Sequence, residues 1–153
     1  RAPIFDSAAR GVFFGINAET TREDMLYAVM EGIAFSLYHI YENMGKPRGN
    51  TIRISGGAAK SAALNALKAE LFGKDVCTLS ENDTSALGAA KVAAQASGIA
   101  PEGTVFNHIR ETVSPKGNMH ARLMARYAIY KQLYPSLSEQ FTAFTKLERN
   151  EEK

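Results

Sequence analysis

Two adjacent glycines are the residues of this chain best placed to meet a ligand. Gly56 and Gly57 follow a short apolar run and precede a stretch rich in Ala, Leu, Lys and Glu, which predicts a strand, a glycine turn and a helix. Because glycine has no Cβ, its backbone can take φ > 0 and a ligand can lie almost against the main chain. The start of a helix also presents N–H groups without partners. These are the physical properties of a turn that faces a nucleotide.

Other patterns share parts of this turn. A Walker A loop requires G-x-x-x-x-G-K-[ST], but Ala59 precedes Lys60, and Ile54 stands where the first glycine should be. A dinucleotide fingerprint requires G-x-G-x-x-G, which residues 55–60 do not supply. The remaining alternative is a helix entry that uses two glycines for a tight bend and meets no ligand. On these residues alone, the nucleotide turn and the tight bend both stay open.

The other polar residues do not form a catalytic pattern. The three histidines are His39, His108 and His120. They do not have the spacing of metal ligands, so we predict no metal site. No pair of carboxylates is poised as acid and base, and we expect solvated or capping roles for Glu31, Glu42, Glu81 and Asp83. The serines lack a nucleophile elbow, which argues against a hydrolase triad.

Composition excludes several classes of protein. The chain has 153 residues, which suits one domain, and 45% of them are hydrophobic, which is enough for a core. A net charge of +2 gives no strong case for nucleic acid, and no apolar run reaches membrane-spanning length. The single cysteine, Cys77, excludes an internal disulfide and lies in an apolar run, so we expect a buried thiol in the cytoplasm. A first residue that is Arg1 rather than methionine suggests a fragment or processed piece.

The elements that position the turn follow from periodicity. Residues 51–54 predict a short buried strand, and residues 75–79 a second strand parallel to it, because a helix links the two in a right-handed crossover. Residues 11–16 predict a buried strand, residues 84–97 a helix with a tightly packed small-residue face, and residues 108–113 a short strand.

Two longer helices complete the expectation. A capping box over residues 20–23 starts a helix that runs through Leu26 to Met44, in which Gly32 implies a close neighbour. Residues 118–147 predict a helix that is bent or broken at Pro135, with a charged end over residues 148–153 that frays.

Several stretches together resemble the FGGY carbohydrate kinases. Residues 11–31 fit that family's second signature at every constrained position, residues 54–61 resemble its adenosine motif, and residues 85–90 resemble its hinge-side helix. Residues 1–3 and 9–11 resemble the loop before the signature. The aromatic tail resembles the terminal helix of xylulose-kinase-type members and carries Tyr127, Tyr130 and Tyr134.

The resemblance implies an α/β fold that is part of an actin- and hexokinase-like (ribonuclease H-like) ATPase lobe, with a short sheet and packed helices. Such a kinase closes over ATP, Mg²⁺ and a sugar or polyol and moves the γ-phosphoryl group to a hydroxyl. By the same resemblance, Gly56, Gly57 and Ala58 approach the adenosine and α-phosphate, Ser61 lies near the base, and Lys60 is a further candidate. The family's third glycine is Ala58 here, and its usual glutamine and aspartate are Ala66 and Glu70.

The resemblance also implies what this chain lacks. The family's catalytic aspartate and its N-terminal sugar-binding lobe would precede Arg1, so residues 1–153 would be the distal part of the C-terminal lobe, with no catalytic residue. The substrate implied is a ketopentose such as xylulose, bound through the missing lobe, and the partner is the rest of the kinase or a second copy. The alternative is a non-catalytic, stand-alone nucleotide-binding or interaction module.

Overall fold

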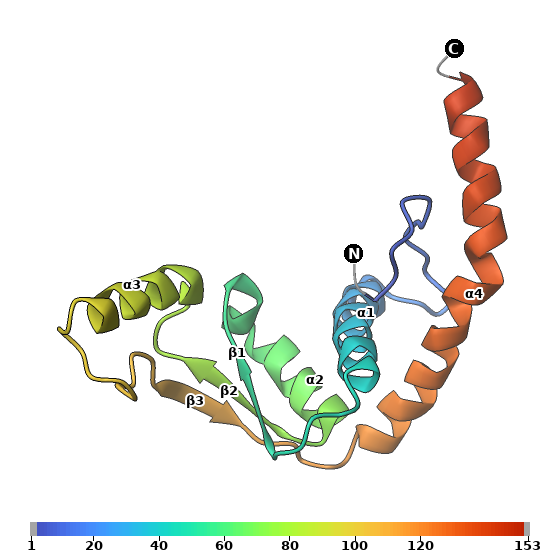
Figure 1. Cartoon of the computed structure of the whole chain (residues 1–153). Helices are drawn as coiled ribbons and strands as arrows, with labels where there is room; N and C mark the ends of the chain where they lie inside the picture. The colour runs from blue at the N-terminus through green and yellow to red at the C-terminus, as the bar shows by residue number, and fades with distance from the viewer. Residues whose placement is uncertain (1–2, 152–153) are drawn as a thin grey trace. The chain divides into compact units, whose positions relative to one another are not determined.

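A computed structural model describes residues 3–151 (Figure 1). The chain forms two compact units, each with its own internal packing. The helical unit comprises Arg1–Pro47 and His120–Lys153, and the sheet unit comprises Arg48–Met119. The resemblance at residues 1–2 and the fraying expected at residues 152–153 lie outside the described residues. Residues 148–151, which we also expected to fray, are helical.

The sheet unit contains a three-stranded mixed sheet in the order β1-β2-β3. Strand β1 (Thr51–Ile54) runs parallel to β2 (Asp75–Leu79), and α2 (Ala62–Phe72) connects them. Strand β3 (Ile109–Val113) pairs antiparallel with β2. The positions of the predicted strand, helix and parallel strand are therefore confirmed, as is the strand expected within residues 108–113. The burial expected for residues 51–54 is wrong, because the residues of β1 alternate between exposed and partly buried.

The core of the sheet unit lies between α2 and β2. Leu64, Leu67 and Leu71 on α2 are buried, and so is Val76 on the strand. Cys77 is a free cysteine and is also buried, as predicted. Helix α2 ends at Gly73, which has φ +61° and closes the helix in the left-handed conformation that glycine adopts most readily. This core holds the end of β1, and so the turn after it, in place.

The helical unit is built on two packed helices, α1 (Arg22–Asn43) and α4 (His120–Glu151). Their contact is aromatic. The Tyr127 ring lies edge-on to Tyr38, with ring centroids 4.9 Å apart, and 5.8 Å from Phe35. Tyr127 is only 1% exposed and is among the largest fully buried side chains of the described residues. The apolar periodicity of residues 26–44 correctly predicted α1.

The cap of α1 differs from the prediction by one residue. Thr21 is the N-cap, and it forms a capping box with Asp24 rather than the expected box over residues 20–23. The Thr20 hydroxyl instead accepts a hydrogen bond from the Asn17 N–H, at 2.9 Å, and donates to its side-chain oxygen. Thr20 therefore belongs to the turn before the helix. The Thr21 hydrogen bonds lower the pKa of Asp24.

Two carboxylates expected to be solvated instead join α1 to α4. Glu31 is buried and lies 2.7 Å from the Arg126 guanidinium. Glu42 accepts hydrogen bonds from the Tyr127 hydroxyl at 2.8 Å and from the Lys131 ammonium at 3.0 Å. Periodicity identifies a helix but not the charges on the element that packs against it, so the sequence alone could not pair these residues.

The Glu42 network should make the helical unit sensitive to acid. Hydrogen bonds from Lys131 and Tyr127 lower the pKa of Glu42 below its ordinary 4.5. A depressed pKa in the folded state contributes stability that is present above the unfolded value and is lost as the pH falls through the folded value. We therefore expect the protection factors of the α1 amides, which are corrected for the intrinsic pH dependence of exchange, to fall as the pH drops below about 4.5, and Glu42→Gln to flatten this dependence.

The matched control for Glu42 is Glu139→Gln, which changes an exposed carboxylate of α4 that forms no ion pair within residues 3–151. This control should keep the wild-type pH profile. An unchanged profile in Glu42→Gln would contradict the assignment.

Two other expectations about the helical unit are wrong. Residues 11–16 do not form a buried strand: they are exposed, with Phe14 69% exposed, because no described residue provides a partner strand for their backbone. Gly32 has no close neighbour either, since a Cβ placed there would meet nothing within 4 Å. Residues 11–16 and Gly32 both line a cavity that is described below.

Helix α4 continues through Pro135 without a break. Proline has no N–H and cannot donate the hydrogen bond that a helix interior requires, so a bend is the expected response. Figure 1 shows α4 changing direction partway along its length. The bent alternative is the one observed. Across residues 3–151, no helix combines the length and the apolar character needed to cross a membrane.

Candidate functional site

The glycine turn lies where the first parallel strand ends. Ser55 and Gly56 connect β1 to η1 (Gly57–Lys60), a short 3₁₀ helix that precedes α2. Because β1 and β2 are parallel, their carboxyl ends meet at one edge of the sheet, which is where open α/β sheets bind ligands. The loop after β2 leads to α3 (Thr84–Ala96), and the Thr84 hydroxyl lies 3.2 Å from the Ser55 hydroxyl. The turn and the start of α3 are therefore neighbours.

The two glycines have different conformations. Gly56 has φ +82° and ψ −173°, a region that essentially only glycine occupies. Gly57 does not have a positive φ, contrary to our expectation, because it is already the first residue of η1. A Cβ added at either residue would meet nothing within 4 Å. Gly56 is thus needed for the bend, whereas Gly57 leaves open space beside the backbone.

The helix after the turn begins in two steps rather than one. The 3₁₀ helix η1 comes first, and Ser61 then caps α2, with its hydroxyl accepting a hydrogen bond from the Leu64 N–H at 3.3 Å. The hydroxyl oxygen serves the cap, so Ser61 would meet a ligand as a donor. Ala58 and Lys60 are exposed on η1. The first amides of η1 have no acceptor inside that helix, so they can serve as hydrogen-bond donors to a ligand.

Helix α3 begins beside the turn but packs against little of the described chain. Asp83 caps it, accepting a hydrogen bond from the Ala86 N–H at 3.0 Å, which is one of the capping roles expected for the carboxylates. The tight packing expected for its small residues is wrong, since α3 has no buried residue among those described and Val92 is 67% exposed. Small residues permit close packing, but they do not supply the partner.

The histidines do not form a metal site. Among residues 3–151, no group of three or more His, Cys, Asp and Glu side chains could hold a metal ion. His108 is exposed, whereas His39 is partly buried, and its Nδ1 has no hydrogen-bond partner in the described part of the chain. Any Mg²⁺ that accompanied a nucleotide would therefore be held mainly by the phosphates or by residues other than these.

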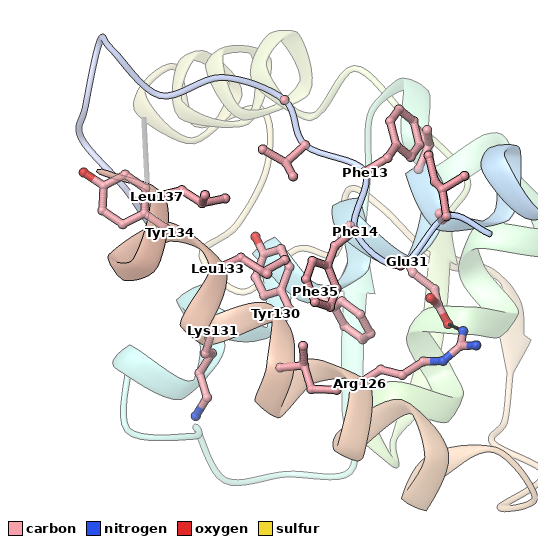
Figure 2. Close-up of a pocket in the computed structure, with 18 of the residues that line it drawn as sticks. Phe13, Phe14, Glu31, Phe35, Arg126, Tyr130, Lys131, Leu133, Tyr134 and Leu137 are labelled. Atoms are coloured by element: carbon pink, nitrogen blue, oxygen red, sulfur yellow. Dashed lines mark hydrogen bonds and ion pairs between the residues drawn. The ribbon is translucent and has the colours of Figure 1, made fainter. Parts of the chain in front are cut away.

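A cavity in the helical unit had no counterpart in our sequence predictions. It has a volume of about 840 Å³ and lies between residues 11–16, α1 and α4. Figure 2 shows the aromatic rings of Phe13, Phe14 and Phe35 beside it, with the Glu31 and Arg126 ion pair at one side. The adjacent phenylalanines were the available signal, but their apolar character was assigned to a buried strand.

Comparison with known proteins gives one family for most of the chain. Residues 1–97 match the model of the C-terminal domain of the FGGY family of carbohydrate kinases. A xylulose kinase of Bacillus subtilis is 31% identical over 157 aligned residues, which cover 98% of this chain and 31% of that protein. A glycerol kinase of Enterococcus casseliflavus is 37% identical over 100 residues, covering 63% of this chain and 20% of that protein.

A solved structure has the same arrangement of elements. The crystal structure of a ligand-bound xylulose kinase from Lactobacillus acidophilus superposes with a TM-score of 0.86 at 29% identity, over 94% of this chain and 30% of that one. The chain thus spans less than a third of the length of each of these three proteins.

Proposed function

Because the chain belongs to the FGGY family of carbohydrate kinases, we propose that it supplies the adenosine-binding part of an ATP-dependent sugar or polyol kinase. Its mixed α/β structure is part of the actin- and hexokinase-like ATPase fold of that family. The proposal assigns the adenosine and α-phosphate to Gly56, Gly57 and Ala58, with Ser61 near the base and Lys60 beside them. Mg²⁺ would accompany the nucleotide.

One observation carries this proposal: the glycine turn lies at the carboxyl end of β1, and the space beside it is open. Gly56 takes a conformation that other residues adopt only under strain, and a Cβ on Gly57 would project into unoccupied space. Phosphoryl transfer depends on positioning and charge stabilisation, and an open turn next to helix N-termini suits the placing of a nucleotide.

Within this proposal the substrate is a ketopentose such as xylulose. The match to a xylulose kinase covers 98% of the chain, whereas the match to a glycerol kinase covers 63%. The aromatic residues of α4, which resemble those in the terminal helix of xylulose-kinase-type members, also support xylulose as the substrate. We also place the kinase in the cytoplasm, where the free thiol of Cys77 stays reduced.

Calorimetry with ATP and a coupled assay with a ketopentose panel test the proposal together. We expect the 153-residue chain, in a preparation of verified mass, to bind ATP but to phosphorylate no sugar. The family resemblance puts the catalytic aspartate and the sugar-binding lobe outside residues 1–153. The longer kinase that carries this sequence should phosphorylate a ketopentose in preference to glycerol. Turnover above blank by the chain alone would refute the division of roles, and absence of ATP binding would refute the proposed site.

The exposed apolar segment predicts that the chain made alone self-associates. Residues 12–14 and Ile16 expose apolar side chains on a segment that lies outside every helix and strand and has no partner strand among the described residues. Unpaired apolar backbone of this kind can pair with another chain. Light scattering should show oligomers or aggregates, and Phe14→Lys should reduce them. Within this proposal, the rest of the kinase covers the same segment and restores a monodisperse species.

Ile99→Lys is the matched control for this experiment, because it places the same charge at an exposed apolar residue of the sheet unit. It should leave self-association unchanged. A stable monomer of about 16.7 kDa with a cooperative thermal transition would contradict the prediction and favour a stand-alone module.

A further inference from the structure

We propose that Asn65 is a positioning residue for nucleotide binding, which holds the turn that carries Gly57 and Ala58. This inference rests on the proposed function, since it assumes that the glycine turn meets ATP. Asn65 lies in the first turn of α2, and its side chain is buried, with 2% of the residue exposed. The sequence did not lead us to expect it in the site.

The contact that carries the inference joins Asn65 to the end of η1. The side-chain amide nitrogen of Asn65 donates a buried hydrogen bond to the Ala59 carbonyl at 2.8 Å. The last carbonyls of a helix have no partner inside it, so Ala59 needs a donor from outside η1. Ala59 is itself 2% exposed, which leaves water little access to that carbonyl. Asn65 is therefore the donor that fixes this end of the turn.

Two backbone hydrogen bonds connect the Ala59 peptide group and the start of α2 to the glycine turn. The Ala59 N–H donates to the Gly56 carbonyl at 3.1 Å, so the peptide groups on both sides of Ala59 are tied. The Asn65 N–H donates to the Ser61 carbonyl at 3.0 Å and holds the other end of the same short segment. Gly57 and Ala58 lie between these fixed points. Their exposed backbone thus has its conformation set by buried neighbours.

The chemistry of Asn65 favours this role over simple packing. Its side-chain oxygen is buried and has no hydrogen-bond partner within residues 3–151. Burying an amide with part of its hydrogen-bonding capacity unused is unfavourable, and an apolar side chain of similar size would avoid that cost. What asparagine provides and leucine cannot is the donor to Ala59.

The test compares Asn65→Asp, Asn65→Ala and the control Asn118→Asp. Aspartate preserves the shape of the side chain but replaces the donor with an oxygen that repels the Ala59 carbonyl, whereas alanine removes the bond without adding charge. Asn118→Asp adds the same charge at an exposed residue of the same unit. The Kd for ATP is measured by calorimetry on the 153-residue chain, and kcat and KM on the longer kinase that carries this sequence.

We expect Asn65→Asp to raise the Kd and the KM for ATP by about tenfold or more, and Asn65→Ala by a smaller factor. The kcat and the KM for sugar should stay near wild type, as should every parameter of Asn118→Asp. A purely structural role would lower kcat through loss of folded enzyme and would not single out ATP. If Asn65→Asp does not fold, Asn65→Ala gives the same comparison.

Unchanged ATP affinity in the folded Asn65 variants would overturn the inference and leave the proposed function intact. A general loss of activity that does not single out ATP would overturn it equally. Absence of ATP binding by the wild-type chain would overturn the proposed function, and this inference with it.

Discussion

Replacing Gly57 with valine should abolish adenine-nucleotide binding while leaving the chain folded. The valine side chain would project into the open space beside the turn, where a Cβ meets nothing within 4 Å, and would occupy the room that a nucleotide needs. Because Gly57 does not have a positive φ, the substitution adds little backbone strain, and we expect the free energy of unfolding to change by less than about 1 kcal/mol. Calorimetry with ATP and thermal unfolding measure the two effects separately.

Two control variants separate occlusion from strain. Gly11→Val makes the same substitution in the helical unit, again without positive φ and in open space, and should leave ATP affinity unchanged. Gly56→Ala imposes a left-handed conformation on a residue with a Cβ and should destabilise the sheet unit by about 1–3 kcal/mol. Wild-type ATP affinity in folded Gly57→Val would count against the assigned site.

Truncating Tyr127 should have the largest effect on stability. Its ring is buried between α1 and α4 and contacts Phe35 and Tyr38, so Tyr127→Ala removes an aromatic side chain from a packed core. Comparable truncations cost about 3–5 kcal/mol. We expect the free energy of opening of the helical unit, measured by hydrogen exchange of the α1 amides, to fall by that amount.

Tyr127→Phe isolates the hydroxyl from the ring. It keeps the aromatic contacts but removes the hydrogen bond to Glu42, and bonds to charged groups contribute about 1.5–3 kcal/mol. Its cost should therefore be smaller than that of Tyr127→Ala. Equal costs for the two variants would show that the hydroxyl, rather than the ring, joins the helices.

Elements with their own internal pattern were predictable from the sequence. The alternation of residues 51–54, the apolar run of residues 75–79 and the helical spacing of residues 26–44 each predicted the element observed. Each of these elements has partners within the described residues: β1 and β2 pair with each other, and α1 packs against α4. For β1, β2 and α1, the structure predicted by the local sequence pattern is therefore the one that the tertiary contacts stabilise.

Predictions failed where the outcome depends on a partner. Residues 11–16 have the composition of a strand but no ladder partner in the described chain, and the small residues of α3 are not buried by any other described residue. The sequence also placed the positive φ at Gly57 as well as Gly56, because glycine permits that conformation without requiring it. The hydrogen bond from Asn65 to Ala59 and the ion pair from Arg126 to Glu31 depend on side-chain packing that periodicity does not specify.

Mapping ATP onto the backbone amides by NMR shows directly whether the glycine turn is the nucleotide site. Our prediction is that titration with ATP shifts the amide signals of Gly56, Gly57, Ala58 and Ser61 most strongly, in ¹⁵N-labelled chain that carries Phe14→Lys to reduce self-association. Saturation with ATP that leaves these signals in place, or that shifts the residues lining the cavity of the helical unit instead, would contradict it.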